Sequence, residues 1–423
     1  MIINKNDEKL TLIKNRGAAL EEGYLERTAD IVSKVRLEGD KALFEFTEKF
    51  DGFKADSASI TVTDEEITAA FAKVSPALIE AMEKAKDNIL SFHKKQVEET
   101  WLTESEGKIL GQKVTPIEKA GVYVPGGKAS YFSSVMMNVL PAVAAGVKDI
   151  TMCTPAVKGI INPALLAAAK ICGVTRVFKI GGAQAIAAMA YGTNTVPKVD
   201  KITGPGNIYV AMAKKLVFGA VDIDMIAGPS EILVIADSSA DAKCVAADML
   251  AQCEHDELAS AVCLTCDSDL AKEIESEIKS QLPLLPKKDI AAVSMDRFSA
   301  IVLVDNIDEA CAVANEIAPE HLELYVESPM EHMMKIKNAG AIFLGGNSPE
   351  AAGDYFAGPN HVLPTGGSAR FFSPLGAYDF MKRSSIIYYT AQGLANDAKH
   401  IIEMAVSEEL EAHANSVRVR IKQ

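Results

Sequence analysis

The segments Asp149-Ile-Thr-Met-Cys153 and Arg176-Val-Phe-Lys-Ile180 are short β-branched runs separated by a helix-like stretch, and this alternation indicates the fold. It continues through Val199-Asp-Lys-Ile-Thr203 and Glu231-Ile-Leu-Val-Ile-Ala236. Strand-like runs that alternate with helical stretches are typical of βαβ units, in which the strands form a parallel sheet. The central part of the chain is therefore predicted to be an α/β domain.

A second series of strand-like runs follows, again separated by helical stretches. Its members are Ala259–Thr265, Ala300–Val304, Leu322–Val326 and Ala341–Leu344. Helical spacing also marks residues 26–50, residues 68–96 and the tail after Ala391. The predicted fold class is α/β, with two parallel-sheet domains and helical N- and C-terminal arms, and ligands in such folds usually bind at the carboxyl ends of the strands.

Length and composition agree with a folded protein of two or three domains. The chain has 423 residues, of which 48% are hydrophobic, and its net charge is −14. An acidic surface disfavours nucleic acid and anionic membranes as partners. The N-terminus is charged where a signal peptide would be apolar, and the longest apolar stretch, Val135–Val147, is too short to span a bilayer, so a cytoplasmic location is expected.

Glycine-rich loops lie beside several predicted strands, yet neither a Gly-x-Gly-x-x-Gly turn nor a Gly-Lys-Ser/Thr phosphate loop is present. The loops are Gly121–Gly127, Gly181–Gln184, Gly204–Asn207 and Ala227–Glu231. Each alone is equally well explained as a turn. Together they indicate places where the backbone approaches a ligand.

Residues suited to metal binding or proton transfer occur in four settings. Gln252 and His255 share one face of a predicted helix, although a surface helix would show the same spacing. Glu320 and His321 precede a strand and could manage protons near neutral pH, or form a solvated loop pair. Asp354 and His361 lie in a Gly/Pro-rich loop, and the pair Cys263 and Cys266 is interpreted as core thiols.

These motifs, in this order, resemble the histidinol dehydrogenase family over nearly all of the chain after Gly121. The resemblance rests on Tyr123-Val-Pro-Gly-Gly127, Gly181-Gly-Ala-Gln-Ala185, Gly204-Pro-Gly-Asn207, Ala227-Gly-Pro-Ser-Glu231, Gln252-x-Glu-His255, Ala318-Pro-Glu-His-Leu322, Gly358-Pro-Asn-His-Val-Leu-Pro-Thr365 and His413. It implies two incomplete Rossmann-like domains that bind NAD⁺ atypically, which accounts for the missing glycine fingerprint. It also implies a homodimer with one Zn²⁺ per subunit and shared active sites.

The resemblance assigns roles residue by residue. The implied zinc ligands are Gln252, His255, Asp354 and His413, the last supplied by the C-terminal tail of the partner subunit. Glu320 and His321 are the implied catalytic pair. The residues implied to bind L-histidinol are Ser230, Gln252, His255, His321, Asp354, His361, Glu408 and His413, and those implied to contact NAD⁺ are Tyr123, Gln184 and Asn207.

A division into domains follows from the same resemblance. Residues 1–20 are expected to form an N-terminal arm, and residues 21–122 with 230–375 a discontinuous α/β domain that carries most of the zinc and catalytic site. Residues 123–229 are expected to form an inserted NAD-binding domain. Residues 376–423 are expected to form a C-terminal helical arm that contributes to the partner's site.

The implied reaction is the oxidation of L-histidinol to the aldehyde and then to L-histidine, the last steps of histidine biosynthesis, with each hydride passing to NAD⁺. His321 would be the general base on the hydroxyl, and Glu320 would activate water. Three alternatives stay open: a zinc hydrolase, a zinc-binding module without catalysis, and an aldehyde oxidation through a thiohemiacetal on Cys253 or Cys153.

Overall fold

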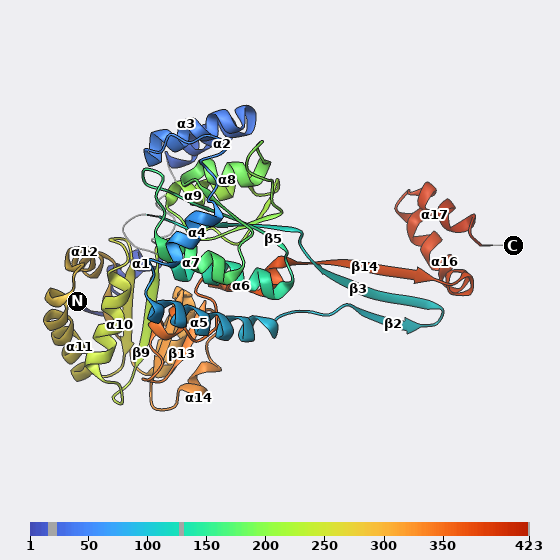
Figure 1. Cartoon of the computed structure of the whole chain (residues 1–423). Coiled ribbons are helices and arrows are strands. Elements are labelled where there is room, and N and C mark those ends of the chain that lie inside the picture. Colours follow the sequence, from blue (N-terminus) through green and yellow to red (C-terminus); the bar gives the residue numbers. More distant parts are fainter. Residues whose placement is uncertain (16–22, 127–130, 422–423) are drawn as a thin grey trace.

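The computed structural model describes residues 1–15, 23–126 and 131–421, in which the strands form three sheets (Figure 1). Gly127, part of a predicted glycine loop, and residues 16–20 of the predicted N-terminal arm lie outside these ranges.

The first sheet, called sheet A, is parallel throughout. Its strands, in spatial order, are β1 (Ile2–Asn4), β11 (Ala300–Leu303), β10 (Ser260–Thr265), β9 (Glu231–Ala236), β12 (His321–Tyr325) and β13 (Ala341–Leu344). Strands β9 and β10 are buried on both faces, as expected for near-continuous apolar runs in a parallel sheet.

Helices cover both faces of sheet A. They are α1 (Glu8–Asn15), α10 (Ala242–Cys253), α11 (Ser268–Gln281), α12 (Lys288–Phe298), α13 (Ile307–Ile317), α14 (Pro329–Met333) and α15 (Glu350–Tyr355). Leu10 and Val313 belong to a core on one face, whereas Met249, Ile274 and Met295 belong to a core on the other. The alternation of side chains along each strand produces these two separate cores.

The second parallel sheet, sheet B, has the order β6 (Arg176–Lys179), β5 (Asp149–Thr154), β4 (Lys119–Tyr123), β7 (Lys201–Thr203) and β8 (Asp222–Ile223). Its helices are α2 (Tyr24–Glu38), α3 (Asp40–Asp51), α4 (Asp64–Phe71), α5 (Pro76–Lys94), α6 (Phe132–Ala145), α7 (Pro163–Cys172), α8 (Gly182–Tyr191) and α9 (Ile208–Val217).

Helices α2 to α5 pack on sheet B, not on sheet A with residues 230–375. Helix α2 contacts α8 and α9, and α5 contacts α6. Strand β4, whose residues 119–122 were assigned to the first domain, is the central strand of sheet B. The structure therefore places most of residues 21–122 with residues 123–229, because an amphipathic pattern shows that a helix face is buried but not against which sheet.

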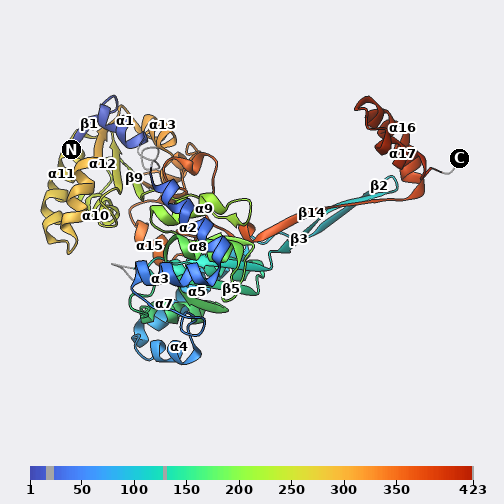
Figure 2. The ribbon, with the colours of Figure 1, turned by 90° about the horizontal axis from the view of Figure 1, so that it is seen from above.

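A third, antiparallel sheet forms a long arm that projects from the body of the molecule (Figures 1 and 2). Its order is β14 (Met381–Tyr389), β3 (Lys108–Pro116) and β2 (Trp101–Ser105), and the helices α16 (Ala391–Ser407) and α17 (Glu411–Arg418) lie at its tip. The sequence predicted helices in the C-terminal arm but not the strand β14, because its alternating residues are mostly exposed and lack a strong apolar periodicity.

The predicted α/β class, the two parallel sheets and the C-terminal helices are confirmed, and all eight strand-like runs are strands. The N-terminal segment was expected to be an arm. Its first residues instead form β1, which pairs with β11 at the edge of sheet A. Among the described residues no helix combines the length and apolar character needed to cross a bilayer. The cytoplasmic location stays a prediction.

The base of the arm is anchored by Phe380, whose side chain is fully buried in the core that α5, α6 and α7 share. We expect Phe380→Ala to lower the free energy of unfolding by about 3–5 kcal/mol, because it removes a large apolar side chain and leaves a cavity. Urea denaturation at fixed subunit concentration measures this change. Leu37→Ala, at a residue 81% exposed on α2, is the control and should change stability by less than about 0.5 kcal/mol.

Candidate active site

The predicted catalytic pair lies at the amino ends of the strands of sheet A. His321 is the first residue of β12, Glu320 precedes it, and Glu231 is the first residue of the neighbouring strand β9. The candidate site of sheet A therefore lies at the end of the strands opposite to the carboxyl ends, where ligands were expected. Loops and helix ends bring its residues together where the adjoining strands β9 and β12 begin.

Backbone and side-chain hydrogen bonds hold these groups together. Glu320 Oε2 accepts from the Glu231 amide at 3.0 Å, and His321 Nδ1 lies 3.2 Å from the Glu231 carbonyl oxygen. Gln252, near the end of α10 and fully buried, donates its side-chain amide to Glu350 Oε2 at 2.8 Å and accepts from the Glu231 amide at 3.2 Å. The backbone amide and carbonyl groups of one residue, Glu231, thus position three of the candidate residues.

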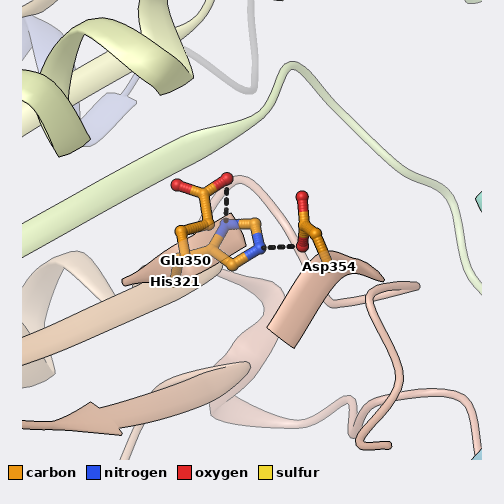
Figure 3. A group of neighbouring side chains, drawn as sticks. All are labelled: His321, Glu350 and Asp354. Atoms are coloured by element: carbon orange, nitrogen blue, oxygen red, sulfur yellow. Dashed lines mark ion pairs between the residues drawn. The ribbon is translucent and has the colours of Figure 1, made fainter. Parts of the chain in front are cut away.

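His321, Glu350 and Asp354 form a compact cluster at this edge (Figure 3). His321 Nδ1 lies 3.8 Å from Glu350 Oε1, and His321 Nε2 lies 3.5 Å from Asp354 Oδ1. One potential ligand atom from each of the three lies within 4.8 Å of the others, close enough to hold a metal ion together. The imidazole is thus held between two carboxylates on the short helix α15.

The sequence predicted Asp354 as a ligand but missed Glu350. Glu350 is buried and lies one turn before Asp354 on α15, so both carboxylates face His321. That four-residue spacing was the only signal that could have found it. The amide of Glu350 donates to Glu323 Oε1 at 2.9 Å, which fixes the start of α15 against β12.

The cluster has perturbed proton affinities. Burial alone would lower the pKa of His321, but the carboxylates of Glu350, Glu320 and Asp354 outweigh it and raise the pKa well above its ordinary value. Burial raises the pKa of Glu320 to about 8 and that of Glu350 to about 7. Carboxyl groups that change protonation near neutral pH are suited to acid and base catalysis.

Asp354 remains a carboxylate. Although burial favours its protonated form, the imidazoles of His321, His361 and His255 hold its pKa below the usual value. His361 lies beside it, with Nδ1 3.0 Å from the backbone carbonyl oxygen of Asp354. His255 is exposed one turn beyond Gln252. An anionic oxygen among imidazoles is a donor set that suits Zn²⁺.

Ser230, directly before Glu231, is half-buried at the same edge. Glu408 and His413 are elsewhere: both are exposed, Glu408 directly after α16 and His413 on α17, at the tip of the projecting arm (Figure 1). Within a single chain the structure therefore brings together the candidate residues of the body but not the two from the tail.

The residues predicted to contact NAD⁺ share the carboxyl edge of sheet B. Tyr123 ends β4, Gln184 lies in the first turn of α8 after β6, and Asn207 caps α9 after β7. Gln184 is 1% exposed, and among the described residues neither of its side-chain amide atoms has a hydrogen-bond partner. Buried polar groups are nearly always paired, so this edge has unmet capacity for a polar ligand.

The N-terminus of α8, one of the helix ends at the carboxyl edge of sheet B, has two backbone amides that are already hydrogen-bonded within the protein. The amide of Gly181 donates to Asp51 Oδ2 at 3.3 Å, and the amide of Gly182 donates to the Tyr123 hydroxyl at 3.0 Å. These two amides are therefore not free to bind a phosphate group.

The cysteine alternative loses support. Cys153 and Cys253 are both fully buried, and burial raises the pKa of the Cys153 thiol. Cys253 Sγ lies 3.4 Å from Ser299 Oγ in the core of sheet A. A nucleophilic thiolate needs an accessible, electropositive setting, which neither residue has.

Comparison with known proteins agrees with these features. A family model described as histidinol dehydrogenase matches residues 14–421. The histidinol dehydrogenase of Syntrophotalea carbinolica is 54% identical over 98% of this chain and 96% of its own length, and that of Aquifex aeolicus is 54% identical over 98% and 97%. The crystal structure of histidinol dehydrogenase from Elizabethkingia anophelis is similar with a TM-score of 0.94 and 41% identity, covering 100% of this chain and 97% of that one.

Proposed function

We propose, from the premise that the chain belongs to the histidinol dehydrogenase family, that it oxidises L-histidinol to L-histidine in two NAD⁺-dependent steps, the last steps of histidine biosynthesis. The observation that carries the proposal is the buried pair Glu320 and His321 beside the Asp354 carboxylate, because alcohol and aldehyde oxidation both require a proton acceptor next to the reacting carbon.

His321 is the proposed general base. Its Nδ1 faces the Glu231 carbonyl oxygen, which can only accept, so Nδ1 carries a proton and Nε2 exchanges one. In the neutral form of the imidazole Nε2 carries no proton, and it would take the proton of the substrate hydroxyl while the hydride passes to NAD⁺. The carboxylates around His321 raise its affinity for that proton. In the second oxidation Glu320, as a carboxylate, would remove a proton from the water that adds to the aldehyde. His321 would then take a hydroxyl proton of the resulting hydrate while a hydride passes from the hydrate carbon to a second NAD⁺, which leaves L-histidine as the product.

Zinc fits the residues at the site. Gln252, His255 and Asp354 would hold it, together with His413 of the partner subunit, and these are nitrogen and oxygen donors of the kind that Zn²⁺ accepts. When bound, the ion supplies positive charge that orients the polar groups of the substrate. The placement of Gln252 and Asp354 at one edge, both beside Glu350, supports this set.

A homodimer with exchanged arms is part of the proposal. The arm carries large exposed apolar residues, including Ile387 at 71% and Met404 at 69% exposure. An extended ribbon with this much exposed apolar surface is not stable by itself and normally packs on another chain. Packing on a second copy would bring Glu408 and His413 to the site of that copy.

Sheet B would bind the dinucleotide at its carboxyl edge. Tyr123, Gln184 and Asn207 surround this edge, and a bound NAD⁺ would supply the hydrogen bonds that the buried Gln184 amide lacks. The Gly181 and Gly182 amides at the N-terminus of α8 are bonded within the protein, so the pyrophosphate would lie away from that helix end.

The reaction is tested by mixing the purified protein with histidinol and NAD⁺ and recording absorbance at the NADH band. We expect NADH to form, with histidine as the product. Dialysis against a chelator should lower the rate about 100-fold or more, since a catalytic metal supplies several kcal/mol. Added Zn²⁺ should restore it. A metal-loaded protein that forms no NADH would contradict the proposal, and a hydrolase would then be the better explanation.

A further inference from the structure

A buried ion pair lies beneath the loop Gly204–Asn207, outside the residues discussed so far. Lys214 lies on α9 and Asp224 follows β8, and their side chains are 3% and 1% exposed. Burying two charges is costly unless further hydrogen bonds satisfy them. The groups that they bond to therefore indicate what the pair does.

The ion pair is hydrogen-bonded to both backbone polar groups of one glycine, its amide and its carbonyl. Asp224 Oδ2 accepts from the Gly204 amide at 2.8 Å, and Lys214 Nζ donates to the Gly204 carbonyl oxygen at 3.0 Å. Asp224 Oδ1 also accepts from the Met225 amide at 2.7 Å, which fixes the carboxylate. The backbone of Gly204 is thus bonded to an anion on one side and a cation on the other, and we call Lys214 and Asp224 the clamp.

Gly204 in turn rests on the backbone of Tyr123. Its φ of +119° is a backbone conformation that residues other than glycine rarely adopt. A Cβ there would collide with the carbonyl oxygen of Tyr123. Three residues later, Asn207 caps α9 by accepting from the amides of Tyr209 at 3.1 Å and Val210 at 3.2 Å. The clamp therefore determines how Tyr123 and Asn207 lie relative to each other.

We propose that Lys214 and Asp224 are positioning residues for NAD⁺: they hold the loop Gly204–Asn207 against Tyr123 so that the two sides of the dinucleotide site keep their spacing. This rests on the proposed function, which places NAD⁺ at this edge. The clamp touches the loop backbone and lies too deep to touch the dinucleotide. Its loss should weaken NAD⁺ binding in both oxidations and leave histidinol and metal binding unchanged.

The test compares wild-type protein with the double variant Lys214→Met/Asp224→Leu, which removes both charges and so leaves no unpaired charge in the core. Asp222→Asn is the matched control. Asp222 lies on the edge strand β8 and pairs with Lys201 of β7, but it is 54% exposed and bonds to no residue of the loop. NADH affinity is measured by fluorescence titration. Metal content and the KM values for NAD⁺ and histidinol are measured separately.

We expect the double variant to raise the Kd for NADH and the KM for NAD⁺ about tenfold or more, the effect of losing hydrogen bonds to charged groups. The KM for histidinol, the metal content and the control variant should stay at wild-type values. Gly204→Ala, which keeps the ion pair but displaces the loop, should raise the Kd for NADH as well, and it decides the matter if the double variant does not fold.

A folded, metal-loaded double variant with wild-type affinity for NADH overturns the inference alone. So does a parallel rise in the KM for histidinol, which would indicate a general loss of structure. If the double variant does not fold, unchanged NADH affinity in Gly204→Ala overturns the inference. Wild-type protein that binds no NADH would overturn the proposed function together with the inference.

Discussion

His321→Asn should lower kcat about 1,000-fold or more while the metal content stays normal. Asparagine keeps a group that can donate to the Glu231 carbonyl oxygen, now 3.2 Å from Nδ1, but it has no counterpart of Nε2. General base catalysis by a positioned side chain contributes about 10²–10⁴-fold, and His321 is the proposed base in both oxidations. NADH formation under saturating histidinol and NAD⁺ measures kcat, and elemental analysis measures the metal.

His255→Asn is the comparison for this experiment. His255 is a proposed ligand, so its replacement should lower the metal content as well as the rate, and added Zn²⁺ should restore part of the rate. In His321→Asn added Zn²⁺ should restore nothing. Substantial turnover by His321→Asn would rule out its role as base, whereas normal metal content in His255→Asn would remove His255 from the ligand set.

Mixing two inactive variants should restore activity, provided that the arm crosses between subunits. In a heterodimer of His321→Asn and His413→Asn chains, one site combines an intact His321 with an intact His413 from the partner chain, and the other site has neither. Random reassociation makes half of the dimers mixed, so the mixture should reach about one quarter of wild-type activity. The rate is measured after joint unfolding and refolding.

Each variant refolded alone is the control and should stay inactive, because every one of its sites lacks the same residue. If the mixture were no more active than these controls, His413 would act within its own chain. Glu408 directly follows α16 and His413 lies on α17, and these two helices lie at the tip of the arm, away from the body that contains β12 and His321 (Figures 1 and 2). This arrangement favours exchange. The large exposed apolar residues on β14 and α16 favour it too.

Most strands of the two parallel sheets were predictable because their signals are local. Runs such as Glu231–Ala236 consist of β-branched and apolar residues that a buried parallel strand requires, and each run became a strand. Strands β1, β2, β3, β4, β8 and β14 were missed. Strands β1 and β8 are very short, and β2, β3 and β14 have no buried residue, so neither apolar runs nor clean alternation marks them. Strand β4 is buried, but it overlaps the stretch Gly121–Gly127, which was interpreted as a loop.

The motifs also identified the family, and the family model and the relatives confirm that resemblance. Roles for single residues are a different matter. Glu320, His321, Gln252 and Asp354 lie at one edge of sheet A, as a shared site requires, but their ligand and catalytic roles stay predictions.

Read alone, the residues of this chain specify which segments are helices or strands and which loops carry unusual chemistry, since both depend on neighbours within a few positions. The folded molecule adds what depends on distant neighbours. It places the candidate site at the amino ends of β9 and β12 and adds Glu350 to it. It also packs α2 to α5 on sheet B and places His413 on an arm that projects from the body. These outcomes depend on tertiary packing, which determines what each buried face contacts. A periodic sequence pattern indicates only that a face is buried.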